Sequence, residues 1–304
     1  MKNKVSNVIL SLLAASSLLL SAPAEIYAAT QSSTGAGTSA AAAGTTGTVT
    51  PNTIATPVIL TDNLPYANYS AIHTGAAMLY TNTAANANGI TVCVNAGHGT
   101  VGGEKYKTLS HPDGSPKVTG GTTGAGAVKS TAISSGMSFK DGTSEASVTL
   151  KEALILKTLL LNSGYNVLMI RETADLQLDN VARTVLANNY ANCHIAIHWD
   201  STTSDKGAFY CKVPNNLTYK AMEPVASTWA KSDLFGECLI NGLRSVGRKI
   251  NGNGSMEIDL TQTSYSTIPS IDIELGDKAS DHSDQTLTKI ATGLLLGVNQ
   301  YFGR

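Results

Sequence analysis

The sequence predicts one α/β domain over residues 89–304, with a mainly parallel, twisted sheet flanked by helices on both faces. Two observations predict this fold class. Short apolar runs rich in β-formers alternate with longer helical stretches, as expected for parallel strands joined by crossover helices. At roughly 200 residues, this part of the chain is also large enough for one well-packed core.

The individual elements follow from the spacing of apolar residues. Glu145–Ser163 is predicted to be a helix, because Leu150, Leu154 and Leu161 share one face and Gly164 follows as a C-terminal stop. The other predicted helices are Leu178–Tyr190, about Val225–Val246 and about Gln285–Phe302. The predicted strands are Ile90–Val94, Val167–Ile170, Cys193–His198, Ala208–Val213, Met256–Leu260 and Ser270–Glu274.

The N-terminal region before this domain divides into three segments. Residues 1–24 have the basic head, apolar run and small-residue cleavage pattern of a signal peptide, with a retained anchor as the alternative. Residues 25–50 are rich in Ser, Thr, Gly and Ala and are interpreted as a flexible spacer. Residues 51–88 carry apolar side chains without clear periodicity, so the sequence leaves open whether they fold alone, pack on the domain or stay extended.

Composition excludes several function classes. The chain has no long basic run, so neither nucleic acid nor an anionic membrane is expected as a partner. The N-terminal apolar run is short for a membrane span, and no stable span is expected after signal cleavage. The four cysteines lack the Cys-x-x-Cys spacing of a structural zinc site. A bridge between Cys211 and Cys238 is compatible with export but is not assigned by the sequence.

Candidate functional residues gather where the predicted strands end. His98 follows the first strand in a glycine-flanked loop, His198 ends a later strand, and Glu274 ends the last strand. Glu145 begins the helix after the first strand. Because ligands bind at the carboxyl ends of parallel strands, these four side chains are expected to converge at one edge of the sheet.

Two neutral imidazoles and one carboxylate suit a catalytic zinc ion, because they leave a position open for water. We therefore expect His98, Glu145 and His198 as ligands of one Zn²⁺, with Glu274 as the general base. Asp272 lies on the same strand face as Glu274 and is a rival base. Each residue also has a structural alternative, such as Glu145 complementing a helix dipole.

Other histidines are not expected in the site. His194 lies four residues before His198 on one strand, roughly 13 Å away, and is expected to be a packed core residue. The sequence identifies no partner for His73, His111 or His282.

The ordered motifs resemble the zinc-dependent N-acetylmuramoyl-L-alanine amidase family, whose catalytic domain is of the amidase 3 type. The family's opening Gly-His-Gly motif corresponds here to Gly97-His98-Gly99, and its ligand glutamate at a helix start corresponds to Glu145. Its strand ending in Ile-His is similar to Ile197-His198, and its late Glu-x-Gly to Glu274-Leu275-Gly276. Arg171 and Arg183 also match arginines of the family pattern.

The N-terminal pattern implies a secreted protein, and the resemblance implies a cell-wall-associated enzyme whose partner is peptidoglycan. Its substrate would be the amide between the lactyl group of N-acetylmuramic acid and the L-alanine of the stem peptide. It assigns the ligand role to His98, Glu145 and His198, and the base role to Glu274. The alternatives are a zinc peptidase or carboxypeptidase acting on the stem peptide, and a catalytically silent wall-binding module.

The sequence departs from the family pattern at Trp199-Asp200, at Asp272 and at Asp277. The stretch of about residues 99–144 between the first strand and Glu145 is also long for the family. A long loop inside a compact domain is usually functional. We therefore expect it to form a wall or lid of the glycan groove, the alternative being a mobile surface insertion.

Overall fold

The computed structural model describes residues 52–304. The predicted signal peptide, residues 1–24, and the predicted spacer, residues 25–50, lie outside the described residues. Among the helices of the described part, none combines the length and apolarity that crossing a membrane requires.

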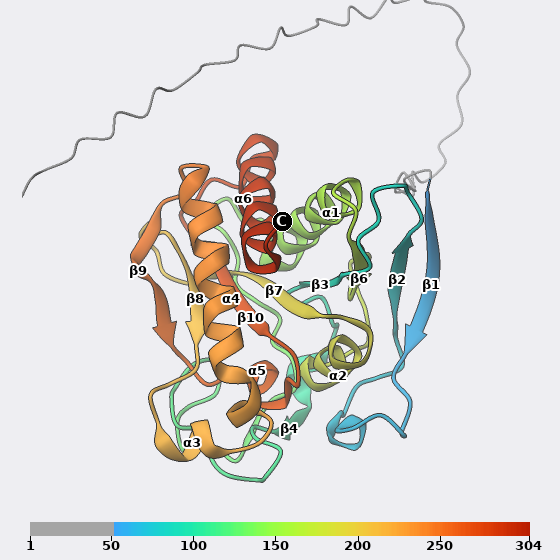
Figure 1. The fold of residues 1–304 in the computed structure, drawn as a ribbon. Coiled ribbons are helices and arrows are strands. Elements are labelled where there is room, and N and C mark those ends of the chain that lie inside the picture. Colours follow the sequence, from blue (N-terminus) through green and yellow to red (C-terminus); the bar gives the residue numbers. More distant parts are fainter. Residues whose placement is uncertain (1–51) are drawn as a thin grey trace, which may run out of the picture. The chain divides into compact units, whose positions relative to one another are not determined.

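The centre of the domain is an eight-stranded mixed sheet in the order β1-β2-β6-β3-β7-β10-β8-β9 (Figure 1). In chain order the strands are β1 (Thr53–Ile59), β2 (Ala76–Asn82), β3 (Thr91–Ala96), β6 (Asn166–Met169), β7 (Cys193–Asp200), β8 (Ala208–Lys212), β9 (Ile250–Glu257) and β10 (Ser270–Asp277). The four central strands β6, β3, β7 and β10 run parallel to one another. Their carboxyl ends therefore meet at one edge, as the predicted mainly parallel sheet requires.

Helices cover both faces of the sheet, which confirms the predicted fold class. The helices are α1 (Glu145–Asn162), α2 (Asn180–Tyr190), α3 (Leu217–Ala221), α4 (Val225–Ser245), α5 (Thr261–Tyr265) and α6 (Asp284–Phe302). On one face α1, α4 and α6 bury a large apolar cluster against the central strands, with Leu156, Leu239 and Leu294 among its members. On the other face α2 packs Leu186 against Cys93 and Leu168. The two clusters hold the sheet, and with it the strand ends, in place.

Residues 52–88 are part of the same sheet. The strands β1 and β2 pair antiparallel with each other, and β2 pairs antiparallel with β6. Val58 and Ala77 are buried in the cluster beneath α2. The segment that the sequence left open thus extends the sheet beyond β6.

Several predicted boundaries differ from the structure by a few residues, and two of them have a local explanation. The strand predicted at Met256–Leu260 is β9 at Ile250–Glu257, an edge strand whose Asn-Gly-Asn-Gly sequence lacks the expected apolar alternation. The helix predicted from Leu178 begins at Asn180, because the side chain of Asp179 accepts a hydrogen bond from the Ala182 amide (2.8 Å) and caps the helix.

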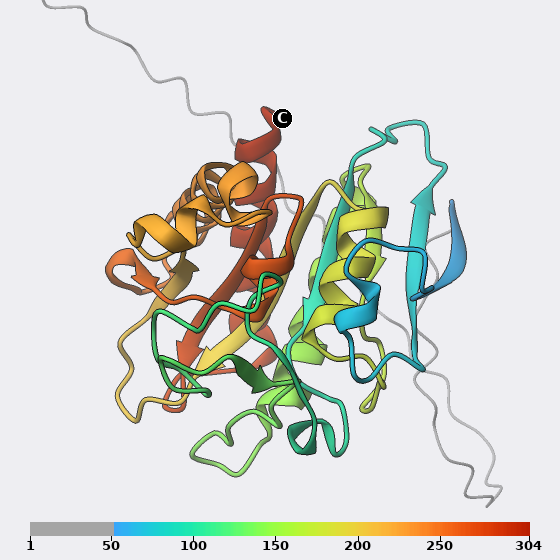
Figure 2. The ribbon, with the colours of Figure 1, turned by 90° about the horizontal axis from the view of Figure 1, so that it is seen from below.

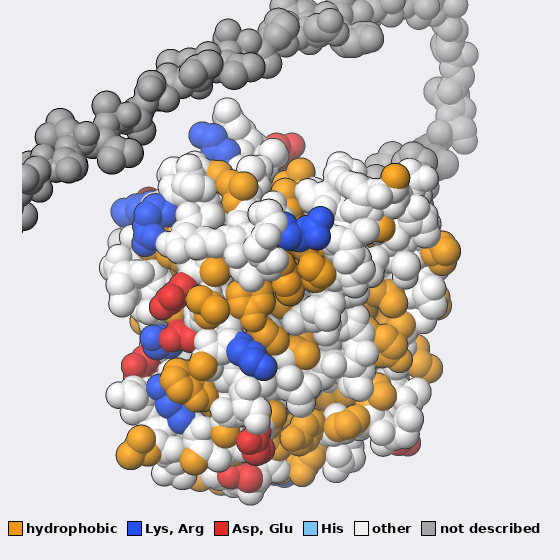
Figure 3. All heavy atoms as spheres, viewed as in Figure 1, with side chains coloured by type: hydrophobic (Ala, Val, Ile, Leu, Met, Phe, Trp, Pro, Cys, Tyr) orange, Lys and Arg blue, Asp and Glu red, His pale blue; other side chains and the backbone are white. Residues whose placement is uncertain are grey.

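The segment between β3 and α1 contains its own small hairpin, β4 (Lys107–Leu109) paired with β5 (Lys129–Thr131). Figure 2 shows this green segment on the side of the molecule nearest the viewer. Charged side chains are scattered over the face in Figure 3, without a large patch of one sign on that face of the described chain.

Candidate functional site

The loop after β3 holds His98 in an unusual backbone conformation. His98 has a φ of 62°, in the left-handed region, between Gly97 and Gly99. Two buried arginines fix this turn through its carbonyls: Arg171 donates to the Gly97 oxygen (2.9 Å) and Arg183 to the His98 oxygen (2.7 Å). The Gly-His-Gly motif is therefore a rigid support for one imidazole.

Glu145 is the first residue of α1, where Ser144 caps the helix by accepting from the Ser147 amide. Its carboxylate accepts hydrogen bonds from the Met137 amide (2.9 Å) and the Trp199 amide (3.0 Å). Each amide donates to a different oxygen of the carboxylate, and together they orient the group toward the end of β7.

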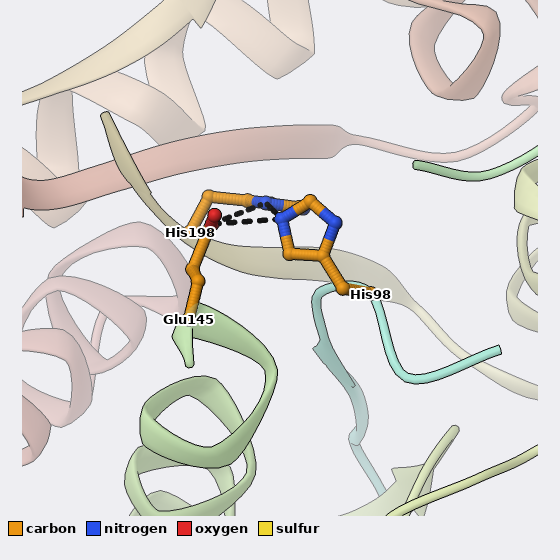
Figure 4. A group of neighbouring side chains, drawn as sticks. All are labelled: His98, Glu145 and His198. Carbon is orange, nitrogen blue, oxygen red and sulfur yellow. Dashed lines mark hydrogen bonds and ion pairs between the residues drawn. The ribbon is translucent and has the colours of Figure 1, made fainter. Parts of the chain in front are cut away.

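His98, Glu145 and His198 meet at one point from three different elements (Figure 4). His98 Nε2 lies 2.8 Å from Glu145 Oε1, and His198 Nδ1 lies 3.0 Å from His98 Nε2 and 3.1 Å from Glu145 Oε1. All three ligand atoms lie within 4.8 Å of one another, so together they could hold a metal ion. Two nitrogens and one oxygen form a donor set that suits zinc.

The other nitrogen of His98 fixes its tautomer. Its Nδ1 lies 2.9 Å from the main-chain oxygen of Ser134, which can only accept, so Nδ1 carries the proton. The lone pair then sits on Nε2, the atom that faces Glu145 and His198. Sequence reasoning did not single out Ser134, because it comes from the long loop and acts through a backbone carbonyl.

The electrostatics of the site favour positive charge. Burial opposes ionisation of Glu145, but its contacts with the His198 and His98 rings outweigh it and hold its pKa well below the usual range. Burial disfavours the charged form of His198, yet the charge of Asp272 and the hydrogen bond to Glu145 raise its pKa to about 10. A site that stabilises a cation in this way fits a metal ion.

Strand β10 brings both candidate bases into the site. Glu274 pairs in register with His198, and Asp272 lies two residues earlier on the same face. Asp272 Oδ2 is 3.6 Å from His198 Nε2. Burial raises the pKa of both carboxyl groups, and neither Glu274 Oε2 nor Asp272 Oδ1 has a hydrogen-bond partner among the described residues. Both carboxyl groups therefore have an oxygen available for a proton.

The departures from the family pattern have structural roles. Trp199 is buried, with its ring 6.0 Å from that of Phe139. Asp277 is fully buried and accepts hydrogen bonds from the Lys206 amide (2.7 Å) and the Ala279 amide (3.0 Å). It therefore holds the loop that follows β7.

The site opens into a cavity of about 590 Å³. Its floor includes His198, Asp272 and Glu274 at the strand ends. One wall comes from the long segment between β3 and α1, including Lys117, Thr122 and Ser134. A volume of this order accommodates a small-molecule-sized portion of a larger substrate.

The remaining histidines and the cysteines lie outside the metal-binding group. His194 is fully buried, and burial lowers its pKa to about 3, so it is a neutral core residue as expected. His282 lies 3.2 Å from Asp141, and His111 contacts Asp259 away from the three ligand atoms. All four cysteines are free, so Cys211 and Cys238 form no bridge.

The fold and the site define a hydrolase of the α/β class with a candidate metal centre at the ends of its parallel strands. The model of the N-acetylmuramoyl-L-alanine amidase family matches residues 92–298, which is more than half of the chain. The chain therefore belongs to this family. It is an enzyme that hydrolyses the amide between N-acetylmuramic acid and L-alanine in peptidoglycan.

Solved structures support the fold. The amidase Ami1 of Mycobacterium smegmatis is 18% identical with a TM-score of 0.58, covering 72% of this chain and 99% of that chain. The apo form of Ami1 from Mycobacterium abscessus is 20% identical with a TM-score of 0.56, covering 71% and 99%. An amidase of Clostridium difficile 630 is 18% identical with a TM-score of 0.51, covering 71% and 98%. Among curated protein sequences, none matches this chain.

Proposed function

We propose that His98, Glu145 and His198 hold one zinc ion and that Glu274 is the general base of the amidase reaction. The observation that carries this proposal is the convergence of three ligand atoms within 4.8 Å of one another beside Glu274, whose Oε2 is buried and has no hydrogen-bond partner among the described residues. His98 is fixed in the tautomer that a metal ligand needs, and the Met137 and Trp199 amides orient Glu145.

When bound, zinc would polarise the lactyl carbonyl and make a water molecule more acidic. Glu274 accepts the proton of the attacking water and passes it to the departing amine of L-alanine. The raised pKa of Glu274 supports both steps, because it makes the ionised carboxylate a stronger base and lets the carboxyl group retain the proton until the amine leaves. Asp272, beside His198, is the rival for this role.

The proposal includes export to the cell wall, where peptidoglycan is found. Its support is the sequence pattern of residues 1–24, a basic head followed by an apolar run and a small-residue cleavage site. Peptidoglycan as the substrate, and with it a location at the wall, follows from the family, whereas secretion rests on this N-terminal pattern.

The test compares the chain from Glu25 onward with its Glu274→Ala and Asp272→Asn variants. Bound zinc is measured, and muropeptide products are identified by mass spectrometry. We expect stoichiometric zinc in all three proteins and a loss of about 10²–10⁴-fold in turnover only for Glu274→Ala.

Each other outcome has a distinct meaning. A comparable loss for Asp272→Asn alone would assign the base to Asp272. Products with shortened stem peptides would indicate a zinc peptidase instead. An absence of both zinc and cleavage would favour a silent wall-binding module.

A further inference from the structure

A buried carboxylate outside the metal-binding group anchors the long segment between β3 and α1. Asp259 lies between β9 and α5 and is fully buried. Its carboxylate accepts hydrogen bonds from Lys117 Nζ (2.9 Å), the Val118 amide (2.8 Å) and the Thr119 amide (3.1 Å). The Thr119 hydroxyl also donates to it, and the Asp259 amide donates to that hydroxyl oxygen (2.8 Å).

His111, a few residues before Lys117 in the same segment, completes the anchor. Its Nε2 lies 3.0 Å from Asp259, its Nδ1 lies 2.9 Å from Ser115 Oγ, and its ring packs 4.9 Å from that of Tyr219. Lys117 and His111 are themselves buried, with 7% and 1% of their surface exposed. A buried charge with so many donors holds a segment in one geometry, because removing either partner leaves the other unpaired in the interior.

A short loop of the chain begins at the anchored residues. The Lys117 amide donates to the Ala127 oxygen (3.0 Å) and the Gly126 amide donates to the Lys117 oxygen (2.8 Å), which closes the base of a loop over residues 118–125. Within this loop Gly121, Thr122 and Thr123 line the active-site cavity. A Cβ at Gly120, Gly121 or Gly124 would meet no atom within 4 Å, so the peptide groups of the tip are accessible.

The chemistry of this end of the cavity differs from that of the metal end. Residues 118–128 carry no charged side chain, and their polar groups are peptide groups and threonine hydroxyls. Met256, Ile258 and Leu260 add apolar surface to the lining of the same cavity. Neutral hydrogen-bonding groups beside apolar side chains suit a sugar ring with hydroxyl and acetamido substituents, whereas Glu145, Asp272 and Glu274 make the metal end acidic.

We propose that residues 120–124 form a saccharide-binding wall of the cavity and that Asp259 is its positioning residue. The inference rests on the proposed amidase function, because it assigns the sugar part of that substrate to this wall. Asp259 does not touch the reacting atoms. It acts by fixing Lys117, Val118 and Thr119, so the wall does not have to be ordered when substrate binds.

The experiment uses the full mature chain with bound zinc and follows amide cleavage of a muropeptide that carries its disaccharide. Asp259→Asn keeps the size of the side chain but weakens the anchor. Gly121→Glu leaves the anchor intact and places a charge on the neutral wall, where there is room for a side chain. For both variants we expect KM to rise about tenfold, which corresponds to the loss of roughly one hydrogen bond to the substrate. We expect kcat and zinc content to stay unchanged.

Asp233→Asn is the matched control. Asp233 on α4 also pairs with a lysine, because its Oδ2 lies 2.8 Å from Lys212 Nζ. Unlike the wall residues, Asp233 does not line the cavity. This variant should keep the KM of the parent. Binding of a peptide-free N-acetylated disaccharide, measured by calorimetry, provides a second readout and should weaken by a similar factor only in the two wall variants.

The outcomes separate this inference from the proposed function. A parent protein without zinc or cleavage would refute the function, whereas parental KM and saccharide affinity in both wall variants would refute the wall alone. A fall in kcat or zinc content for Asp259→Asn would show that Asp259 supports the metal site instead. If Asp259→Asn fails to fold, unchanged KM in Gly121→Glu still overturns the wall.

Discussion

At the scale of single residues, the site depends on how closely the backbone of Gly97, the residue before His98, approaches the ring of His198. A Cβ added at Gly97 would lie 2.3 Å from Cε1 and 2.6 Å from Nε2 of the His198 ring. No side chain fits at that distance, so His198 would have to move. The glycine of the motif is therefore required by the neighbouring ligand and not only by the turn.

This contact yields a prediction for Gly97→Ala. Displacing His198 should weaken zinc binding about 10–100-fold and reduce turnover by about 10². Zinc affinity is measured by competition with a chelator, and turnover on muropeptides.

Gly102→Ala is the control in the same loop. Gly102 has a φ of 77°, but a Cβ there meets no atom within 4 Å. It should cost about 1–2 kcal/mol of stability for the left-handed backbone and leave zinc affinity unchanged. Equal zinc affinity in Gly97→Ala and the parent would show that the close approach does not govern the site.

At the scale of elements, α4 and α6 cross at unusually short range. A Cβ at Gly242 of α4 would lie 2.1 Å from the Gly293 oxygen and 2.6 Å from the Gly297 nitrogen of α6. Conversely, a Cβ at Gly297 would lie 2.5 Å from the Leu239 Cα. Three glycines thus let the two helix backbones meet over the large apolar cluster.

Gly242→Ala tests this crossing. Alanine favours an isolated helix, but here it forces α4 and α6 apart, and we expect a net loss of about 1–3 kcal/mol in the free energy of unfolding. Urea unfolding measures it. The neighbouring exposed position provides the control, since Asn241→Ala should change stability by less than about 0.5 kcal/mol. A stabilised Gly242→Ala protein would contradict the close crossing.

The elements also show how far the sequence could predict the structure. The central strands and the helices α1, α4 and α6 were predictable, because buried elements carry continuous or periodic apolar residues. The strand β9 was misplaced and β1 was not predicted, since the first is rich in Asn and Gly and the second is mostly exposed and contains Pro57. Edge strands have little need for apolar alternation.

The same reasoning applies to the site. The convergence of the three ligand candidates and Glu274 on one cavity was predictable, because each stands at the end of a regular element and parallel topology brings such ends together. Asp259 was not, because its partners lie about 140 positions earlier in a segment without secondary-structure periodicity. A single aspartate before a short helix has the appearance of an ordinary helix cap.

At the scale of the whole molecule, the anchor at Asp259 links distant parts of the chain and should influence the pH dependence of stability. Burial opposes ionisation of Asp259, but hydrogen bonds from His111, Thr119, Lys117 and Val118 outweigh it and hold its pKa well below the usual range. His111 and Lys117 are the titratable groups that bond to it. Tyr219, which packs on His111, has its pKa raised to about 12 by burial and stays neutral in acid.

The direction of the effect follows from the depressed pKa. The unfolded chain binds a proton at Asp259 near pH 3.9, whereas the folded protein resists it until lower pH. The stabilisation is therefore fully present above the unfolded pKa and is lost as the pH falls below about 5 towards the folded pKa.

Asp259→Asn removes this contribution, so the parent should exceed the variant in stability most at pH 7 and progressively less at pH 4 and 3. Urea unfolding of both proteins across this range measures the difference, and Glu145, whose pKa is also depressed, is common to both. A stability difference that stays constant from pH 7 to pH 3 would mean that Asp259 is not held ionised by its partners, and the anchor would then rest on packing alone.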